Sequence, residues 1–255
     1  MTGPIGVLYP GHSAEDDYLE LEARLGGGPR FVVQHTEMVE DAHRVDALLD
    51  WGRAERLADG ARALAPLRPS AVVWACTSGS FAFGWEGAHE QAARLAAVAG
   101  VPASSTSLAF VNAVRALGVG AVAVAATYPD DVAQLFAGFL ERDGIRVTSL
   151  RSHDIVMAAE VGTLTEPDLL AIAAGGDDPD AEALLLPDTA LHTIAYLDAL
   201  ERAVGKPVLT ANQVSAWEGL RLAGHRPAHS GLGALFDGTS RTDGHSEGED
   251  RCDDR

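Results

Sequence analysis

The sequence contains little cysteine and little positive charge, and both shortages exclude certain classes of function and partner. Its 255 residues include two cysteines, Cys76 and Cys252, and 19 Lys and Arg residues against 37 Asp and Glu residues, for a formal net charge of −18. A chain this acidic repels nucleic acids and anionic membranes, so we expect neither as a partner. Two isolated cysteines indicate no disulfide framework and favour a reducing, cytoplasmic location.

Long apolar runs, leader signals and cofactor motifs are missing as well. No apolar stretch reaches the roughly 18 residues that a membrane helix needs. Residues 1–4 do not begin a basic and then apolar leader, so we expect no secretory signal. The sequence has no P-loop and no nucleotide-binding glycine motif. Pro227 interrupts its single H-x-x-x-H spacing, between His225 and His229. We therefore expect no cofactor and no metal.

What the sequence does contain is a regular alternation of short apolar runs and amphipathic segments. The runs have the length and composition of strands buried on both faces of a parallel sheet; they cover residues 5–9, 71–75, 121–125 and 183–186. The amphipathic segments predict helices over residues 54–65, 89–99, 108–117, 132–143 and 194–204. This alternation predicts a doubly wound α/β fold, in which ligands bind beyond the carboxyl ends of the strands.

The chain also contains an internal repeat. The strand that ends at Cys76 corresponds to the strand that ends at Asp188. Two further pairs keep the same order, residues 100–118 with residues 205–224 and Tyr9 with Tyr128. The repeat predicts two similar lobes related by a pseudo-twofold axis, with Cys76 and Asp188 converging on one active-site cleft between them. The alternative is the general similarity of all α/β units.

The repeat also divides the chain. Residues 1–118, completed by residues 214–237, form the predicted first lobe, and residues 119–213 form the second. Residues 238–255 are polar and acidic without periodicity or an apolar anchor, so we predict a disordered tail.

Three segments resemble one known superfamily. They are ACTSGS around Cys76, ATYPDDV around Tyr128, and GLGALFD at residues 231–237. Over about residues 5–237 the chain resembles the aspartate/glutamate racemase superfamily, and within it the branch of maleate cis–trans isomerases and arylmalonate decarboxylases. The resemblance implies a cofactor-independent enzyme in which Cys76 is the acid/base or nucleophilic thiol and Tyr128 contacts the substrate carboxylate.

Asp188 departs from the pattern of that branch. Its racemases and maleate isomerases have a second cysteine in the corresponding loop, and its arylmalonate decarboxylases keep only that second one. Here the first-lobe Cys76 is kept and Asp188 replaces the other, which weakens two-thiol racemisation. Asp188 is then a general base opposite Cys76, a charge that repels a departing carboxylate, or a simple helix cap.

Polar residues just after the strands form the predicted substrate-binding set. The helix predicted after Cys76 favours a thiolate there. Thr77 and Ser78 offer donors that would hold a carboxylate as it becomes an enediolate, or that cap the helix. The other members of the set are Pro10, His12, Ser13 and Thr189.

Together these residues predict a decarboxylase-like enzyme acting on a small malonate-type dicarboxylate, with the enediolate protonated by Cys76. Two alternatives stay open. One is a maleate-type isomerase or racemase that uses Cys76 with Asp188, and the other is a non-catalytic carboxylate-binding protein. The expected partner is a small mono- or dicarboxylate; homo-oligomer formation is left open.

Overall fold

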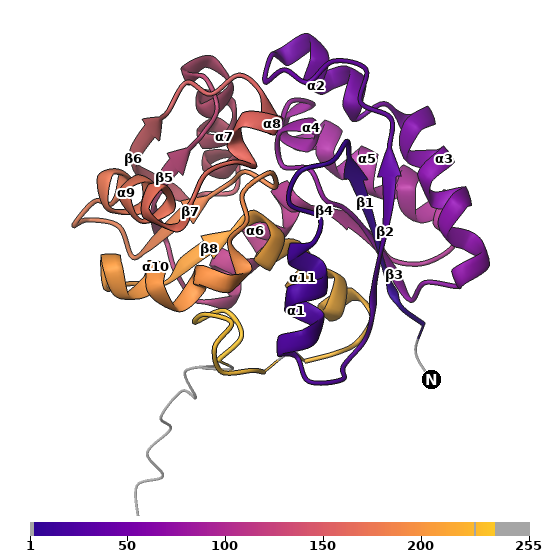
Figure 1. Ribbon diagram of the computed structural model, residues 1–255. Helices are drawn as coiled ribbons and strands as arrows, with labels where there is room; N and C mark the ends of the chain where they lie inside the picture. The colour runs from indigo at the N-terminus through magenta and orange to yellow at the C-terminus, as the bar shows by residue number, and fades with distance from the viewer. Residues whose placement is uncertain (1–2, 227, 238–255) are drawn as a thin grey trace, which may run out of the picture.

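The computed structural model describes residues 3–226 and 228–237, and within them eight strands form two four-stranded parallel sheets (Figure 1). The first sheet has the order β2-β1-β3-β4, and the second has the matching order β6-β5-β7-β8. Their bounds are β1 (Ile5–Pro10), β2 (Phe31–Thr36), β3 (Ala71–Trp74), β4 (Ala103–Ser105), β5 (Ala121–Ala126), β6 (Arg146–Ser152), β7 (Ala183–Leu186) and β8 (Val208–Thr210). The two-lobe α/β prediction is confirmed. The predicted tail, residues 238–255, lies outside the described residues.

Helices cover the faces of both sheets (Figure 1). Their bounds are α1 (Asp17–Arg24), α2 (Val45–Trp51), α3 (Ala54–Leu64), α4 (Ser78–Phe81), α5 (Gly84–Ala99), α6 (Thr106–Ala116), α7 (Asp130–Arg142), α8 (Ala158–Val161), α9 (Glu166–Gly176), α10 (Leu197–Val204) and α11 (Ala211–Leu222). The helix predicted over residues 194–204 is split, because a 3₁₀ turn at Ile194–Tyr196 precedes α10. Among the described residues, no helix combines the length and the apolar character needed to cross a membrane.

The four central strands were predictable because they are apolar along their whole length. β1, β3, β5 and β7 are buried at every position, as expected for strands covered on both faces. The edge strands β2 and β6 are mostly half-buried and carry polar residues, so their sequences FVVQHT and RVTSLRS lack an apolar run. Because the strands of each sheet are parallel, the loops that follow them all lie at the same edge of that sheet.

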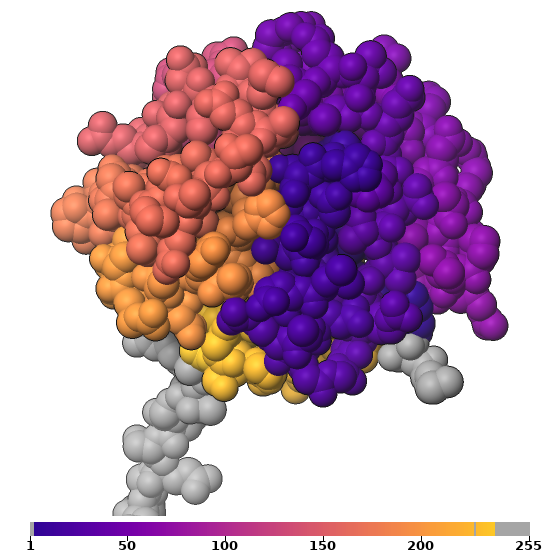
Figure 2. All heavy atoms as spheres, viewed as in Figure 1, coloured from indigo at the N-terminus to yellow at the C-terminus, as the bar shows by residue number. Residues whose placement is uncertain are grey.

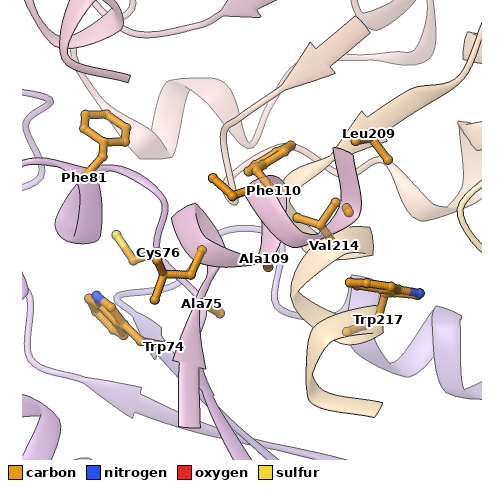
Figure 3. Packing of buried hydrophobic residues seen from close by; sticks show 14 of the residues in the cluster. Trp74, Ala75, Cys76, Phe81, Ala109, Phe110, Leu209, Val214 and Trp217 are labelled. Carbon is orange, nitrogen blue, oxygen red and sulfur yellow. The ribbon is translucent and has the colours of Figure 1, made fainter. Parts of the chain in front are cut away.

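Aromatic rings and two helices join the lobes into one core. Phe136 of α7 lies 5.4 Å from Phe81 and 5.5 Å from Phe110, between ring centroids. Such pairs contribute about 0.5–1.5 kcal/mol each beyond the area that they bury. The helix α11 follows the second sheet, yet it packs on α6 and β3 of the first, where Val214 lies near Phe110 (Figure 3).

This crossing supports a first lobe of residues 1–118 and 214–237 and a second lobe of residues 119–213. We propose that division, and its exact boundaries stay a prediction. In the space-filling view the indigo start of the first lobe lies directly against the orange segments of the second (Figure 2).

Candidate active site

A small cavity lies at the junction of the lobes, beyond the carboxyl ends of β1, β3 and β7. Its volume is about 20 Å³, room for a single water molecule. Most of the predicted site residues line it: Cys76, Asp188, Pro10, His12, Ser13, Ser78 and Thr189. Thr77 and Tyr128 are buried beside the cavity without lining it. A larger groove of about 700 Å³ lies between α3 and α5, but neither Cys76 nor Asp188 lines it. We therefore place the candidate site in the small cavity, because of its reactive side chains and not its volume.

Cys76 is held at the end of β3 with its side chain almost fully buried (Figure 3). The Gly79 amide donates a hydrogen bond to the sulfur at 3.2 Å, and the Ser78 hydroxyl lies 3.8 Å from it. The pKa of Cys76 is raised to about 12, chiefly by burial and in small part by the nearby Asp188, against the opposing effect of the Gly79 and Ser78 contacts. The raised pKa disfavours the thiolate that a helix after Cys76 would favour. Burial outweighs the local donors, and at neutral pH the sulfur carries its proton.

Alkylation tests this protonation state directly. In a Cys252→Ser background, we expect iodoacetamide to modify Cys76 very slowly at pH 8, because a pKa of about 12 leaves a thiolate fraction of about 10⁻⁴. The rate should rise with pH, and urea-unfolded protein should react like a free cysteine. Rapid labelling of folded protein at pH 7 would contradict a buried neutral thiol.

Asp188 follows β7 and is held in a fixed orientation. The Thr127 hydroxyl donates to Oδ2, and the Ala190 amide donates to Oδ1 at 2.9 Å. A turn rather than an α-helix follows, so the carboxylate serves as a local turn acceptor and not as the cap of a long helix. Asp188 and Cys76 thus reach one cavity from opposite lobes, as the repeat predicted.

A buried histidine that the sequence did not reveal completes the arrangement. His43 lies in the loop between β2 and α2, and its Nε2 is 3.9 Å from Oδ2 of Asp188. Its Nδ1 donates to the carbonyl of Ile155 at 3.1 Å, which aims Nε2 at the carboxylate. Its ring also meets Tyr128 edge-on at 4.8 Å. The sequence did not predict β2 as a strand. The loop after β2, which carries His43, therefore could not be placed beside the cavity from the sequence.

Two tyrosine hydroxyls donate hydrogen bonds to backbone carbonyls around the cavity. Tyr9 donates to the Thr189 carbonyl at 2.8 Å, and Tyr128 donates to the Pro187 carbonyl. Burial raises the pKa of Tyr128 well above its ordinary value, and the nearby Asp188 adds to this, whereas the contact with Thr77 lowers it. The contact of Tyr128 with a substrate carboxylate therefore stays a prediction, and it requires the hydroxyl to leave Pro187.

Thr77 is the better-placed donor. Its hydroxyl is buried and makes no hydrogen bond of ordinary geometry among the described residues, although it lies near enough to Tyr128 to lower the pKa of that tyrosine; its carbonyl accepts from Ser107 at 2.7 Å. A buried hydroxyl without a partner is costly in an apolar setting. An anionic ligand next to Cys76 would supply the missing acceptor.

Contacts between the lobes close the cavity. The carboxylate of Asp41 accepts from the amides of Ala158 and Ala159 at 2.7 and 3.0 Å, and the His43 amide donates to Val156 at 2.6 Å. Because the cavity has room for about one water molecule, its walls must move apart before a substrate can bind, and these contacts hold two of those walls together.

The loop that carries Asp188 is also anchored by Asp17 of α1. Oδ2 of Asp17 accepts from the Thr193 amide at 2.8 Å and from Asn212 at 3.1 Å. Burial raises the pKa of Asp17 from 3.8 to about 6, although these hydrogen bonds lower it. The folded state thus binds the proton more tightly than the unfolded chain. That stabilisation is complete below about pH 3.8 and is lost as the pH rises through about 6.

Urea unfolding of Asp17→Asn at pH 4 and pH 7 measures this effect. Between those values we expect the wild type to lose about 2 kcal/mol of unfolding free energy relative to the variant. The same pH dependence in both proteins would show that Asp17 is not the titrating group.

Comparison with known proteins gives one consistent answer. The family model described as arylmalonate decarboxylase matches residues 52–236. The arylmalonate decarboxylase of Bordetella bronchiseptica is 36% identical over 190 residues, which are 72% of this chain and 78% of that protein. The maleate isomerase of Nocardia farcinica is 27% identical over 133 residues, 52% of this chain and 53% of the isomerase. A crystal structure of a mutant arylmalonate decarboxylase in its liganded form has a TM-score of 0.82 at 28% identity, covering 92% of this chain and 99% of that one.

Proposed function

The chain belongs to the arylmalonate decarboxylase family, and on that basis we propose that it decarboxylates a small aryl-substituted malonate with Cys76 as the proton donor. The predicted branch of the aspartate/glutamate racemase superfamily is confirmed by the same relatives, and with it a decarboxylase-like enzyme. The substrate and the roles of individual residues belong to the proposal.

The proposed reaction needs one proton and no external electron source. The bond between the α-carbon and one carboxylate breaks and CO₂ leaves, while the electron pair forms an enediolate with the remaining carboxylate. The Cys76 S–H proton moves to the α-carbon to form the new C–H bond. Water then returns a proton to the sulfur.

The observation that carries this proposal is the neutral, buried thiol that lines the cavity opposite Asp188. A thiolate has no proton to give, whereas a thiol with a pKa of about 12 is protonated when the enediolate forms. Hydroxyl donors from Ser78, which lines the cavity, and from Thr77, which is buried beside it, lie next to Cys76. We propose that they hold the carboxylate that stays, because preorganised donors stabilise charge as it develops.

The two carboxylates of the substrate meet different surroundings. One faces the donors beside Cys76. The other would lie towards Asp188 and the cavity walls formed by Met38 and Trp51. An apolar wall desolvates the departing carboxylate, and the charge of Asp188 repels it, so both favour the loss of CO₂. The rings of Trp51 and Tyr9 offer the surface that an aryl group needs.

The maleate-isomerase alternative rests on the Nocardia relative. Isomerisation by thiol addition requires a nucleophilic thiolate, and racemisation requires a second proton carrier opposite the first. The raised pKa of Cys76 disfavours the first requirement. Asp188 meets the second only as an unequal partner, so we place isomerisation second.

Turnover of phenylmalonate in D₂O tests the assignment. We expect CO₂ release and phenylacetate with one deuterium introduced at the α-carbon by the reaction. Deuterium exchange or maleate conversion without CO₂ would assign the isomerase alternative. Tight binding of the diacid without either reaction would indicate a carboxylate-binding protein and overturn the proposed decarboxylation.

We also propose a cytoplasmic location and a small dicarboxylate as the only partner that the reaction requires. A reduced thiol is essential to the mechanism, and reducing compartments preserve one. Cell fractionation that recovered the protein from an oxidising compartment would count against this.

A further inference from the structure

Two histidines and a glutamate meet at the rim of the cavity, outside the proposed reaction. His12 and Glu15 lie in the loop after β1, and His35 lies on β2 directly opposite Tyr9 of β1. One ligand atom from each of the three side chains lies within 4.8 Å of the other two. The spacing of these residues along the sequence does not predict the cluster. The pairing of β1 with β2 brings His35 next to the loop that carries His12 and Glu15.

Hydrogen bonds from the backbone fix how two of these side chains are oriented. Nδ1 of His35 donates to the carbonyl of Gly11 at 2.6 Å, so the lone pair of this ring lies on Nε2 in its neutral form. That atom is 3.9 Å from Oε1 of Glu15. The Ser13 amide holds Oε2 of Glu15 at 2.7 Å, which leaves Oε1 for the two rings. A histidine whose second nitrogen donates to a backbone carbonyl is the usual arrangement around a metal ligand.

The contacts of His12 complete the set. Its Nδ1 lies 2.9 Å from Oε1 of Glu15, and its ring centroid lies 3.8 Å from that of His35. Two imidazole nitrogens and one carboxylate oxygen therefore lie close enough together to face the same small volume. A lone pair of His35 facing a carboxylate is unfavourable unless a proton or a cation lies between them.

The donor set favours one class of ion. Two imidazoles and a carboxylate match the ligands of Zn²⁺, and imidazole selects zinc, nickel or copper over magnesium and calcium. Metal–ligand bonds of about 2.0–2.1 Å require ligand atoms about 3.3 Å apart. Oε1 of Glu15 is already closer than this to Nδ1 of His12, at 2.9 Å, and lies 3.9 Å from Nε2 of His35, so the site needs only a small adjustment. The side chain of His12 is 73% exposed and free to adjust. The net charge of −18 also enriches cations at the surface.

We propose that His12, Glu15 and His35 bind a divalent transition-metal ion of the zinc class, with a fourth position open to solvent at the mouth of the cavity. Bound metal would tie the loop after β1 to strand β2. Because His12 also lines the cavity, the ion would lie beside the cavity wall. This site does not depend on the proposed decarboxylation and stands or falls by its own test.

Titration of the full chain with Co²⁺ tests the site. We expect one equivalent to produce the visible absorption of a low-symmetry, nitrogen-ligated complex, and Zn²⁺ to displace it. His12→Ala and His35→Ala should each weaken binding by at least about 10²-fold, the upper range for changes in the surroundings of a metal ligand. His192→Asn is the matched control, because His192 is a nearby histidine paired with Asp16 and outside the cluster.

Two further variants separate this site from other metal-binding groups. Cys76→Ala removes the thiol of the cavity, and Cys252→Ser removes the other thiol of the chain. Both should bind Co²⁺ as the wild type does. Circular dichroism of His12→Ala checks that the variant folds. We expect it to fold, because the side chain of His12 is mostly exposed and its removal costs little packing. Absence of Co²⁺ binding at pH 7.5, or equal binding by the wild type and both histidine variants, would overturn the proposal.

Discussion

Replacement of Cys76 by alanine is expected to lower kcat for arylmalonate decarboxylation by about 10²–10⁴-fold, the contribution typical of a positioned general acid. The variant retains the cavity, the donors of Thr77 and Ser78, and the opposing Asp188, so substrate binding should change little. Residual product should be racemic when the substrate is prochiral, because water would protonate the enediolate from either face. Steady-state CO₂ release, together with chiral analysis of the product, measures both effects.

The second cysteine provides the matched control for this variant. Cys252→Ala removes a thiol outside the described residues and should leave kcat and KM unchanged. Thermal unfolding of Cys76→Ala separates lost chemistry from lost structure, since the side chain is small and one sulfur is removed. Wild-type turnover by a folded Cys76→Ala protein would contradict both the decarboxylase and the isomerase assignments.

Asp188→Asn is expected to lower kcat and KM together. The carboxylate of Asp188 and a substrate carboxylate repel each other by about 1–4 kcal/mol at a separation of about 4 Å, depending on the local dielectric. Removing the charge relieves this repulsion in the bound substrate, so binding tightens. It also removes a force that expels CO₂, so kcat should fall by about 10–10³-fold.

In this variant Oδ1 can still accept from the Ala190 amide, and the side-chain NH2 can donate to the Thr127 hydroxyl oxygen, so the fold should survive. The exposed Asp16, in the nearby loop, supplies the control, and Asp16→Asn should alter neither constant. A rise in KM for Asp188→Asn would show that Asp188 attracts the substrate through a shared proton, contrary to the repulsive role.

The sequence predicted the central strands, where burial is complete, and missed the edge strands β2 and β6, where burial is partial. Strands such as β5, AVAVAA, show an uninterrupted apolar run because helices cover both faces of the sheet. The edge strand β6, RVTSLRS, pairs with β5 alone and exposes several side chains, so its sequence resembles a loop. The repeat supplied what single elements could not, because it predicted a second sheet of the same order.

The same contrast holds for the site. Cys76 and Asp188 follow central strands, and strand ends in a parallel sheet are where ligands bind, so position alone identified them. His43 reaches the cavity from a long loop after an edge strand, and its role depends on the contact of that loop with Ile155 in the other lobe. Such contacts between distant segments leave no periodic trace in the sequence.

One landmark of the repeat is shifted. Tyr9 and Tyr128 were predicted to be equivalent. Extended beyond the paired residues, the strand registers instead place Pro10 level with Cys76, and Thr127 level with Asp188. Thr127 therefore holds the Asp188 carboxylate, while Tyr128 points to the Pro187 carbonyl. Register depends on hydrogen bonding between strands, which sequence similarity across a repeat of short apolar runs does not resolve.

Moving the thiol across the cavity tests the central claim most directly. The double variant Cys76→Ala with Asp188→Cys removes the proposed donor from the first lobe and places a thiol on the opposite wall. With methyl(phenyl)malonate as the substrate, the wild type should form one enantiomer of 2-phenylpropionate, and the double variant should form an excess of the other. The same enantiomer in the same excess from both proteins would show that Cys76 does not deliver the proton.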